Sequence, residues 1–153
     1  MEISIHAARA AAQLGRTVNL ALGDVALTPA GYRMLAYLAT GETAAKVLAA
    51  KLAISRPTVT ATLDWLEPHG YVTRSPSVAD RRRVDIAITP AGHAVLAEAD
   101  RRIIERLRDV LGEVDASEVG SIVRGLEVLG DALNEYRVRN LPPESRPHGT
   151  LDS

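Results

Sequence analysis

The sequence predicts a mainly α-helical fold that carries one small β-hairpin. Apolar residues recur every three to four positions through most of the chain, which is the spacing of one helix face. Residues 71–75 and 83–89 instead alternate between apolar and polar side chains, as paired strands do. Turn-forming and charged residues separate these two stretches, so a hairpin is expected. At 153 residues the chain has the size of one domain.

Two helices are expected at the N-terminus. Residues 5–22 place apolar side chains on one face, and Gly23 ends this helix. Thr28 has the side chain of an N-cap, and Pro29 suits the first position of the second helix. Gly41 is expected to end the second helix.

Two shorter helices follow, joined by a tight turn at residues 53–54. Thr43 is the expected N-cap of the third helix. Ser55 opens the fourth helix, which ends by Gly70. Two short helices, a tight turn and a hairpin together form a winged helix-turn-helix, which is predicted here over residues 43–89.

Two longer helices are expected after the hairpin. The first spans Pro90–Leu111, and a capping box of Asp115 and Glu118 opens the second. The tail, residues 140–153, has neither periodicity nor apolar content and is expected to be disordered. The folded domain is therefore predicted over residues 5–139.

The fourth helix has a face that suits the major groove of DNA. Val59, Leu63 and Leu66 can pack on the third helix, which turns Ala61 and Trp65 outward. Hydroxyls, a guanidinium and backbone N–H groups at the N-terminus can reach phosphates and base edges. Threonine methyl groups favour thymine, so we expect A/T-rich half-sites that are read largely through DNA shape. The candidate contacts outside the hairpin tip are Ser55, Arg56, Thr58, Thr60, Ala61, Thr62 and Arg74.

The hairpin tip is the second candidate DNA contact. Arg81, Arg82 and Arg83 repel one another in a monomer but fit a narrow minor groove, and Asp80 can hold one of them through an ion pair. Residues 43–89 carry a net charge of +3 against −4 for the remainder, which suits contact with phosphate on one face. A solvated charged turn is the alternative, and a position directly after a helix-turn-helix favours the DNA contact.

The composition argues against several other kinds of protein. Without cysteine, the chain forms no disulfide, thiolate metal site or thiol switch. It has no glycine-rich phosphate loop, no HExxH motif and no clustered nucleophile and base, so we expect neither an enzyme nor a cofactor. No apolar run approaches the roughly 20 residues that cross a membrane. The N-terminus lacks the features of a signal peptide, and the cytoplasm is the expected compartment.

Residues 27–39, 47–72 and 80–92 resemble the MarR family of bacterial transcriptional regulators. The resemblance extends over residues 6–139 and implies a winged helix-turn-helix with dimerisation helices at both ends. It also implies an obligate homodimer on a pseudo-palindromic operator in duplex DNA, with repression that a small-molecule effector relieves in many members. The most specific pattern is an acidic residue, arginines, an alternating strand and Ile-Thr-Pro-x-Gly. Its matches here are Asp80, Arg82, Ile86, Ile88, Thr89 and Gly92.

The chain departs from the family in its recognition helix. Members often carry a basic residue where Ala61 stands and another near Trp65, so the hairpin, or wing, is expected to carry more of the attraction to DNA. Asp85 in the second strand weakens the basic field. Zinc-sensing members need clustered ligands, whereas the four histidines here are scattered, so no metal is expected. A winged-helix module that docks a protein instead of DNA is the alternative function.

The terminal helices, residues 5–23 and 90–139, are expected to form the dimer. Their apolar stripes are longer than the DNA-binding segment can cover. The resemblance implies an effector crevice between these helices and the DNA-binding lobe. Candidates on its walls, each with a purely structural alternative, are His6, Arg9, Tyr32 and Tyr37.

Overall fold

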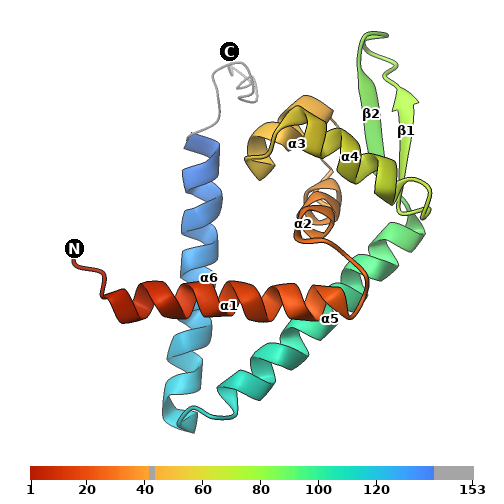
Figure 1. Ribbon diagram of the computed structural model, residues 1–153. Helices are drawn as coiled ribbons and strands as arrows, with labels where there is room; N and C mark the ends of the chain where they lie inside the picture. The colour runs from red at the N-terminus through yellow and green to blue at the C-terminus, as the bar shows by residue number, and fades with distance from the viewer. Residues whose placement is uncertain (42–43, 140–153) are drawn as a thin grey trace, which may run out of the picture.

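The computed structural model describes residues 1–41 and 44–139, and the predicted tail lies outside them. Within these residues the fold is helical with one antiparallel hairpin, as predicted (Figure 1). The helices before the hairpin are α1 (Ile5–Gly23), α2 (Pro29–Leu38), α3 (Ala45–Leu52) and α4 (Arg56–Leu66). The hairpin and the helices after it are β1 (Val72–Pro76), β2 (Val84–Ile88), α5 (Pro90–Leu111) and α6 (Ala116–Arg139).

Hydroxyl caps, each followed at once or one residue later by proline, start three of the helices. Thr28, Ser55 and Thr89 each accept a hydrogen bond from the backbone N–H three residues later, at 3.0, 3.3 and 3.0 Å. The predicted caps of α2 and α4 are thereby confirmed. Helix α3 differs, because its N-cap is Ala44, which makes no side-chain cap bond. Thr43, the predicted cap, lies outside the described residues.

The other predicted helix ends differ in detail. Helix α2 stops three residues before Gly41, which adopts a φ of +93° in the turn that follows. Helix α6 starts as predicted, but the Asp115 carboxylate accepts from the N–H and hydroxyl of Ser117, at 2.9 and 2.5 Å, instead of from the amide of Glu118. The tight turn between α3 and α4 is confirmed, with Ala53 in the left-handed conformation at φ 52°.

The hairpin register places Val72 opposite Ile88 and Arg74 opposite Ile86. A single bridge between Ala44 and Asp85 adds a third short segment at the edge of β2. The sequence analysis missed this bridge, since one residue of pairing leaves no alternating pattern. The bridge ties the start of α3 to the wing.

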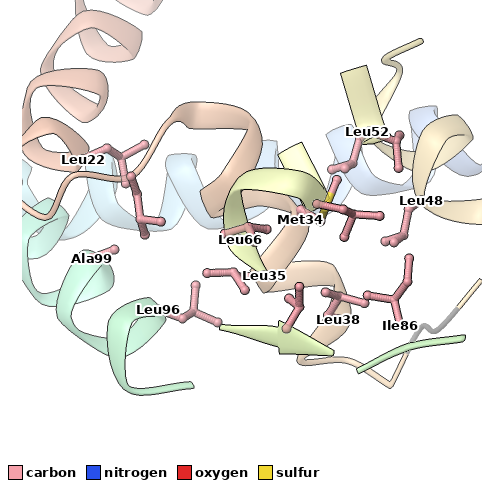
Figure 2. Packing of buried hydrophobic residues seen from close by; sticks show 14 residues of the cluster. Leu22, Met34, Leu35, Leu38, Leu48, Leu52, Leu66, Ile86, Leu96 and Ala99 are labelled. Carbon is pink, nitrogen blue, oxygen red and sulfur yellow. The ribbon is translucent and has the colours of Figure 1, made fainter. Parts of the chain in front are cut away.

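One apolar core joins the helix-turn-helix to the hairpin (Figure 2). Fully buried side chains come from α2, α3, α4 and both strands, and the end of α1 and the first half of α5 close the core. This core orients the wing relative to α4, because both elements contribute side chains to it. Its largest fully buried side chains are Leu22, Met34, Leu35, Leu48, Leu66, Val72 and Ile86.

Helix α6 and the N-terminal half of α1 lie outside this core. Among the side chains of α6 whose burial is described, none is buried, and in Figure 1 most of this helix lies to one side of the lobe formed by α2, α3, α4 and the hairpin. Many of its large apolar side chains are exposed, and so are those at the start of the chain. These exposed side chains are Ile3, Ile5, Ile122, Val123, Val128, Leu129, Leu133 and Tyr136.

Candidate nucleic-acid interface

The N-terminal turns of α4 present a hydroxyl-rich surface whose only charged side chain is the guanidinium of Arg56. Ser55, Arg56, Thr58, Thr60 and Ala61 are exposed, whereas Thr62 is half-buried. The hydroxyls of Thr60 and Thr62 donate to backbone carbonyls four residues earlier, at 3.2 and 2.8 Å. The Thr58 N–H is taken by the Ser55 hydroxyl and Pro57 has none, so the backbone N–H and the guanidinium of Arg56 are what this helix end can offer a phosphate.

The hydrogen bonds of α4 decide what its threonines can offer a ligand. A hydroxyl has one proton, and in Thr60 and Thr62 that proton is directed at the helix backbone. Their remaining oxygen lone pairs can still accept from exocyclic amino groups, while their methyl groups can contact thymine. Thr58 shares a 2.8 Å hydrogen bond with the Ser55 hydroxyl, so these two act as one unit at the helix N-terminus.

Trp65 does not project outward as predicted. It is half-buried against the core, and its indole stacks on the ring of His69 with centroids 4.0 Å apart. His69 in turn has Nδ1 2.7 Å from the Trp65 carbonyl oxygen. The helical angle alone predicted an outward side chain, but the Trp65 ring instead packs near the ring of Tyr71, which directly precedes β1. This contact buries aromatic area, which favours the observed position. Trp65 therefore does not belong to the outward face of α4.

The tip of the hairpin is organised by Asp80. Its carboxylate accepts a 2.9 Å hydrogen bond from the Arg82 N–H, and its backbone carbonyl accepts another from the Arg83 N–H at 2.9 Å. A second carboxylate oxygen lies 3.7 Å from Nε of Arg83. The predicted ion pair is present, and the tip is a tight turn from which Arg81, Arg82 and Arg83 extend exposed. The three cations are therefore held at one end of the wing.

Arg74 is placed differently from the other candidate DNA contacts. Its Nε lies 2.7 Å and its Nη2 2.6 Å from Glu67, and Nη2 lies 2.8 Å from Asp64. These hydrogen bonds, first to Glu67 and then to Asp64, raise the pKa of the guanidinium. Arg74 thus connects β1 to α4, and its charge is already matched by two carboxylates. The sequence carried a signal for this, because residues 64 and 67 share one helix face.

The four effector candidates are not brought together. His6 and Arg9 lie exposed in the first half of α1, whereas Tyr32 and Tyr37 line a hollow of about 340 Å³ between α2, α3 and the end of α6. The Tyr32 hydroxyl donates a 2.7 Å hydrogen bond to Asp100 of α5, and burial raises its pKa, as does that bond. Helix α6 was not expected in this wall. The lining is completed by Arg33, Ala36, Thr40, Lys51, Asn134 and Arg137.

Two further features concern the described residues only. No helix there is long and apolar enough to cross a membrane. Across the same residues, histidines and carboxylates nowhere gather in threes at a spacing that could hold a metal ion.

Comparisons with known proteins show which family this arrangement resembles. The sequence pattern of the MarR family matches residues 27–83. A protein of Thauera aromatica, described as a transcriptional regulatory protein for the hcr operon, is 27% identical over 112 residues. That match covers 72% of this chain and 66% of the relative, slightly less than two thirds of the relative's length.

Solved structures share the fold over most of the chain. The apo form of MarR from E. coli superposes with a TM-score of 0.71 and 21% identity, covering 84% of this chain and 98% of that one. CouR, a transcriptional repressor solved on a 23-mer DNA duplex, gives a TM-score of 0.65 and 27% identity, covering 85% and 99%. With the matching sequence pattern and the helix-turn-helix and wing described above, the chain is similar to the MarR family of transcriptional regulators in sequence pattern and in fold.

Proposed function

We propose that this protein is a transcriptional repressor that binds duplex DNA as a homodimer in the bacterial cytoplasm. In this proposal α4 enters the major groove and the wing enters the adjacent minor groove. One observation carries it: the exposed, capped N-terminus of α4 stands on the same core as a hairpin whose tip holds three exposed arginines. The similarity to the Thauera aromatica regulatory protein and to CouR, a repressor solved on DNA, supports it.

The wing and α4 are expected to contribute differently to DNA binding, because their side chains differ in chemistry. The wing supplies the charge, and its arginines suit the enhanced negative potential of a narrow minor groove. Helix α4 supplies Arg56 for a guanine or phosphate, and otherwise threonine methyl groups and acceptor lone pairs. We therefore expect A/T-rich half-sites in which shape contributes much of the specificity.

The homodimer is proposed from apolar surface that one chain leaves uncovered. The exposed apolar side chains of α6 and of the start of the chain lie where the core does not cover them, on α6 and on the N-terminal half of α1 and the residues before it. A second copy of the chain, packed through these helices and α5, would bury them and set two α4 helices about one duplex turn apart, roughly 34 Å. Binding of the two half-sites would then be linked.

An effector is proposed to act at the hollow between α2, α3 and α6. This hollow lies between the proposed dimer helices and the lobe that carries α4, so its occupant touches both. A ligand can relieve repression only through different affinities for the DNA-bound and unbound spacings of the dimer. Tyr32 connects the hollow to α5 through its hydrogen bond to Asp100, so a ligand that displaced Tyr32 would also act on α5.

The test is a charge-matched pair of triple variants. In the first, Arg81, Arg82 and Arg83 become Gln; in the second, three exposed arginines on α1, α5 and α6 do so. We expect the first to lose about a hundredfold in DNA affinity or more and to flatten the salt dependence, whereas the second, at a concentration where sedimentation velocity shows it to be dimeric, keeps both near wild type. If both variants bind equally well, the wing has no part in DNA binding and a protein-docking module becomes the better account. The control positions are Arg16, Arg108 and Arg124.

A further inference from the structure

Arg74 lies on the side of the hairpin that is turned to the core. It stands directly opposite Ile86, which is fully buried, and two residues from Val72, which is buried as well. Cross-strand partners and alternate residues of a strand share one face of the sheet. The stem of Arg74 is therefore half-buried, and its side chain is only 30% exposed.

The guanidinium of Arg74 is fixed by α4 from two positions. The carboxylate of Glu67, at the end of the helix, accepts a hydrogen bond from Nε and forms an ion pair with Nη2. The carboxylate of Asp64, one turn earlier, accepts a hydrogen bond from Nη2. A guanidinium that meets two carboxylates in this way has a defined orientation, because its donors are coplanar. This cluster links the strand that leads into the wing to the helix proposed to enter the major groove.

We propose that Arg74 is a positioning residue that holds the wing at a fixed angle to α4, and that it does not bind phosphate. The inference rests on the proposed function for its consequence in DNA binding, whereas the contact itself is a property of the free protein. Holding the two elements at one angle lets the wing and α4 reach adjacent grooves together. Losing the contact costs affinity through geometry instead of through charge.

The sign of the effect of Glu67→Gln separates the two roles. This substitution removes a negative charge from a DNA-binding protein, so attraction to phosphate alone would strengthen binding. A positioning role predicts weaker binding, because Arg74 loses the carboxylate that contacts two of its nitrogen atoms. We expect Glu67→Gln and Arg74→Gln each to weaken binding by about tenfold, with little further loss when they are combined.

Salt dependence gives a second readout on the same variants. Arg74→Gln should leave the slope of log affinity against log salt unchanged, because no phosphate contact is lost. Arg81→Gln is the matched control in the wing, and it should flatten that slope by about 1.8, one lost contact in each protomer of a dimer. Arg74→Lys keeps the charge but not the planar two-carboxylate contact, so it should behave like Arg74→Gln.

Hydrogen exchange of the protein without DNA keeps the two proposals distinguishable. Peptides spanning residues 72–88 should exchange about threefold faster or more in Arg74→Gln and Glu67→Gln than in wild type or Arg81→Gln. Wild-type protein that binds no DNA would overturn the proposed function, and these exchange rates would still test the contact. Unchanged exchange, or Glu67→Gln that binds DNA as tightly as wild type or more tightly, would overturn the positioning role.

Discussion

Gly92 allows the closest approach between the wing and the helix that follows it. A methyl group at this position would lie 2.1 Å from the Tyr71 carbonyl oxygen and 2.7 Å from Cγ1 of Ile88. The Tyr71 carbonyl also accepts the 3.0 Å hydrogen bond of the Thr89 N–H, so it is fixed in place. Replacing Gly92 with Ala must therefore push the first turn of α5 away from the base of the hairpin.

The expected cost follows from two opposed effects. Gly→Ala in an open helix normally stabilises by up to about 1 kcal/mol through helix propensity. Here the obstructing atom belongs to the backbone and cannot rotate away, and overpacking of this kind typically costs about 1–3 kcal/mol. We expect the overpacking to win, so the free energy of unfolding of Gly92→Ala falls by about 1–2 kcal/mol net.

Urea unfolding at one fixed protein concentration measures this difference, since the stability of a dimer depends on concentration. Gly15→Ala is the matched control, because nothing lies within 4 Å of a methyl group at that position of α1. We expect the control to be as stable as wild type or more so. A Gly92→Ala variant with an unchanged or raised unfolding midpoint would refute the close contact between α5 and Tyr71.

Three further predictions concern the caps, the dimer and the pH dependence. Ser55→Ala removes the cap of α4 and should lower stability by about 1 kcal/mol in urea unfolding, with weaker DNA binding; unchanged values would contradict the cap. Leu129→Glu, at a position 53% exposed on α6, should shift the monomer–dimer equilibrium toward monomer in sedimentation velocity, and an unaltered dimer would exclude this face. The hydrogen bond from Arg101 keeps the pKa of Glu98 below its ordinary value of 4.5, so its contribution to stability is present above that pH and is lost as pH falls through the lowered value. Stability measured against pH should accordingly fall less steeply in Glu98→Gln, and parallel curves would rule the contribution out.

The order and type of the elements could be predicted because local signals agreed. A hydroxyl cap with a proline close behind it set the start of α2, α4 and α5, and the change from helical to alternating spacing set the hairpin. The start of α3 lacked such a signal, and its observed N-cap Ala44 has no side-chain hydrogen-bonding group. Boundaries were thus most reliable where a side chain fixes the first turn.

The candidate site was predicted in composition but not in all of its contacts. The exposed wing arginines and the turn around Asp80 follow from neighbours in the chain, which the sequence displays. The contacts of Arg74 with α4 and of Trp65 with His69 were missed, because helical angle and charge say nothing of what packs against a residue from elsewhere in the chain. The contribution of α6 to the hollow beside Tyr37 was missed for the same reason, since Asn134 and Arg137 come about 100 residues later in the chain.

The most direct test of the central claim is a titration of labelled duplex DNA taken from beside the protein's own gene. Fluorescence anisotropy would be followed at two salt concentrations, with a shuffled duplex of the same composition as the control. The account predicts saturable binding of one dimer per site, much tighter than to the shuffled duplex, with affinity that falls steeply as salt rises. Weak binding that is equal for both duplexes would contradict operator recognition by α4 and the wing.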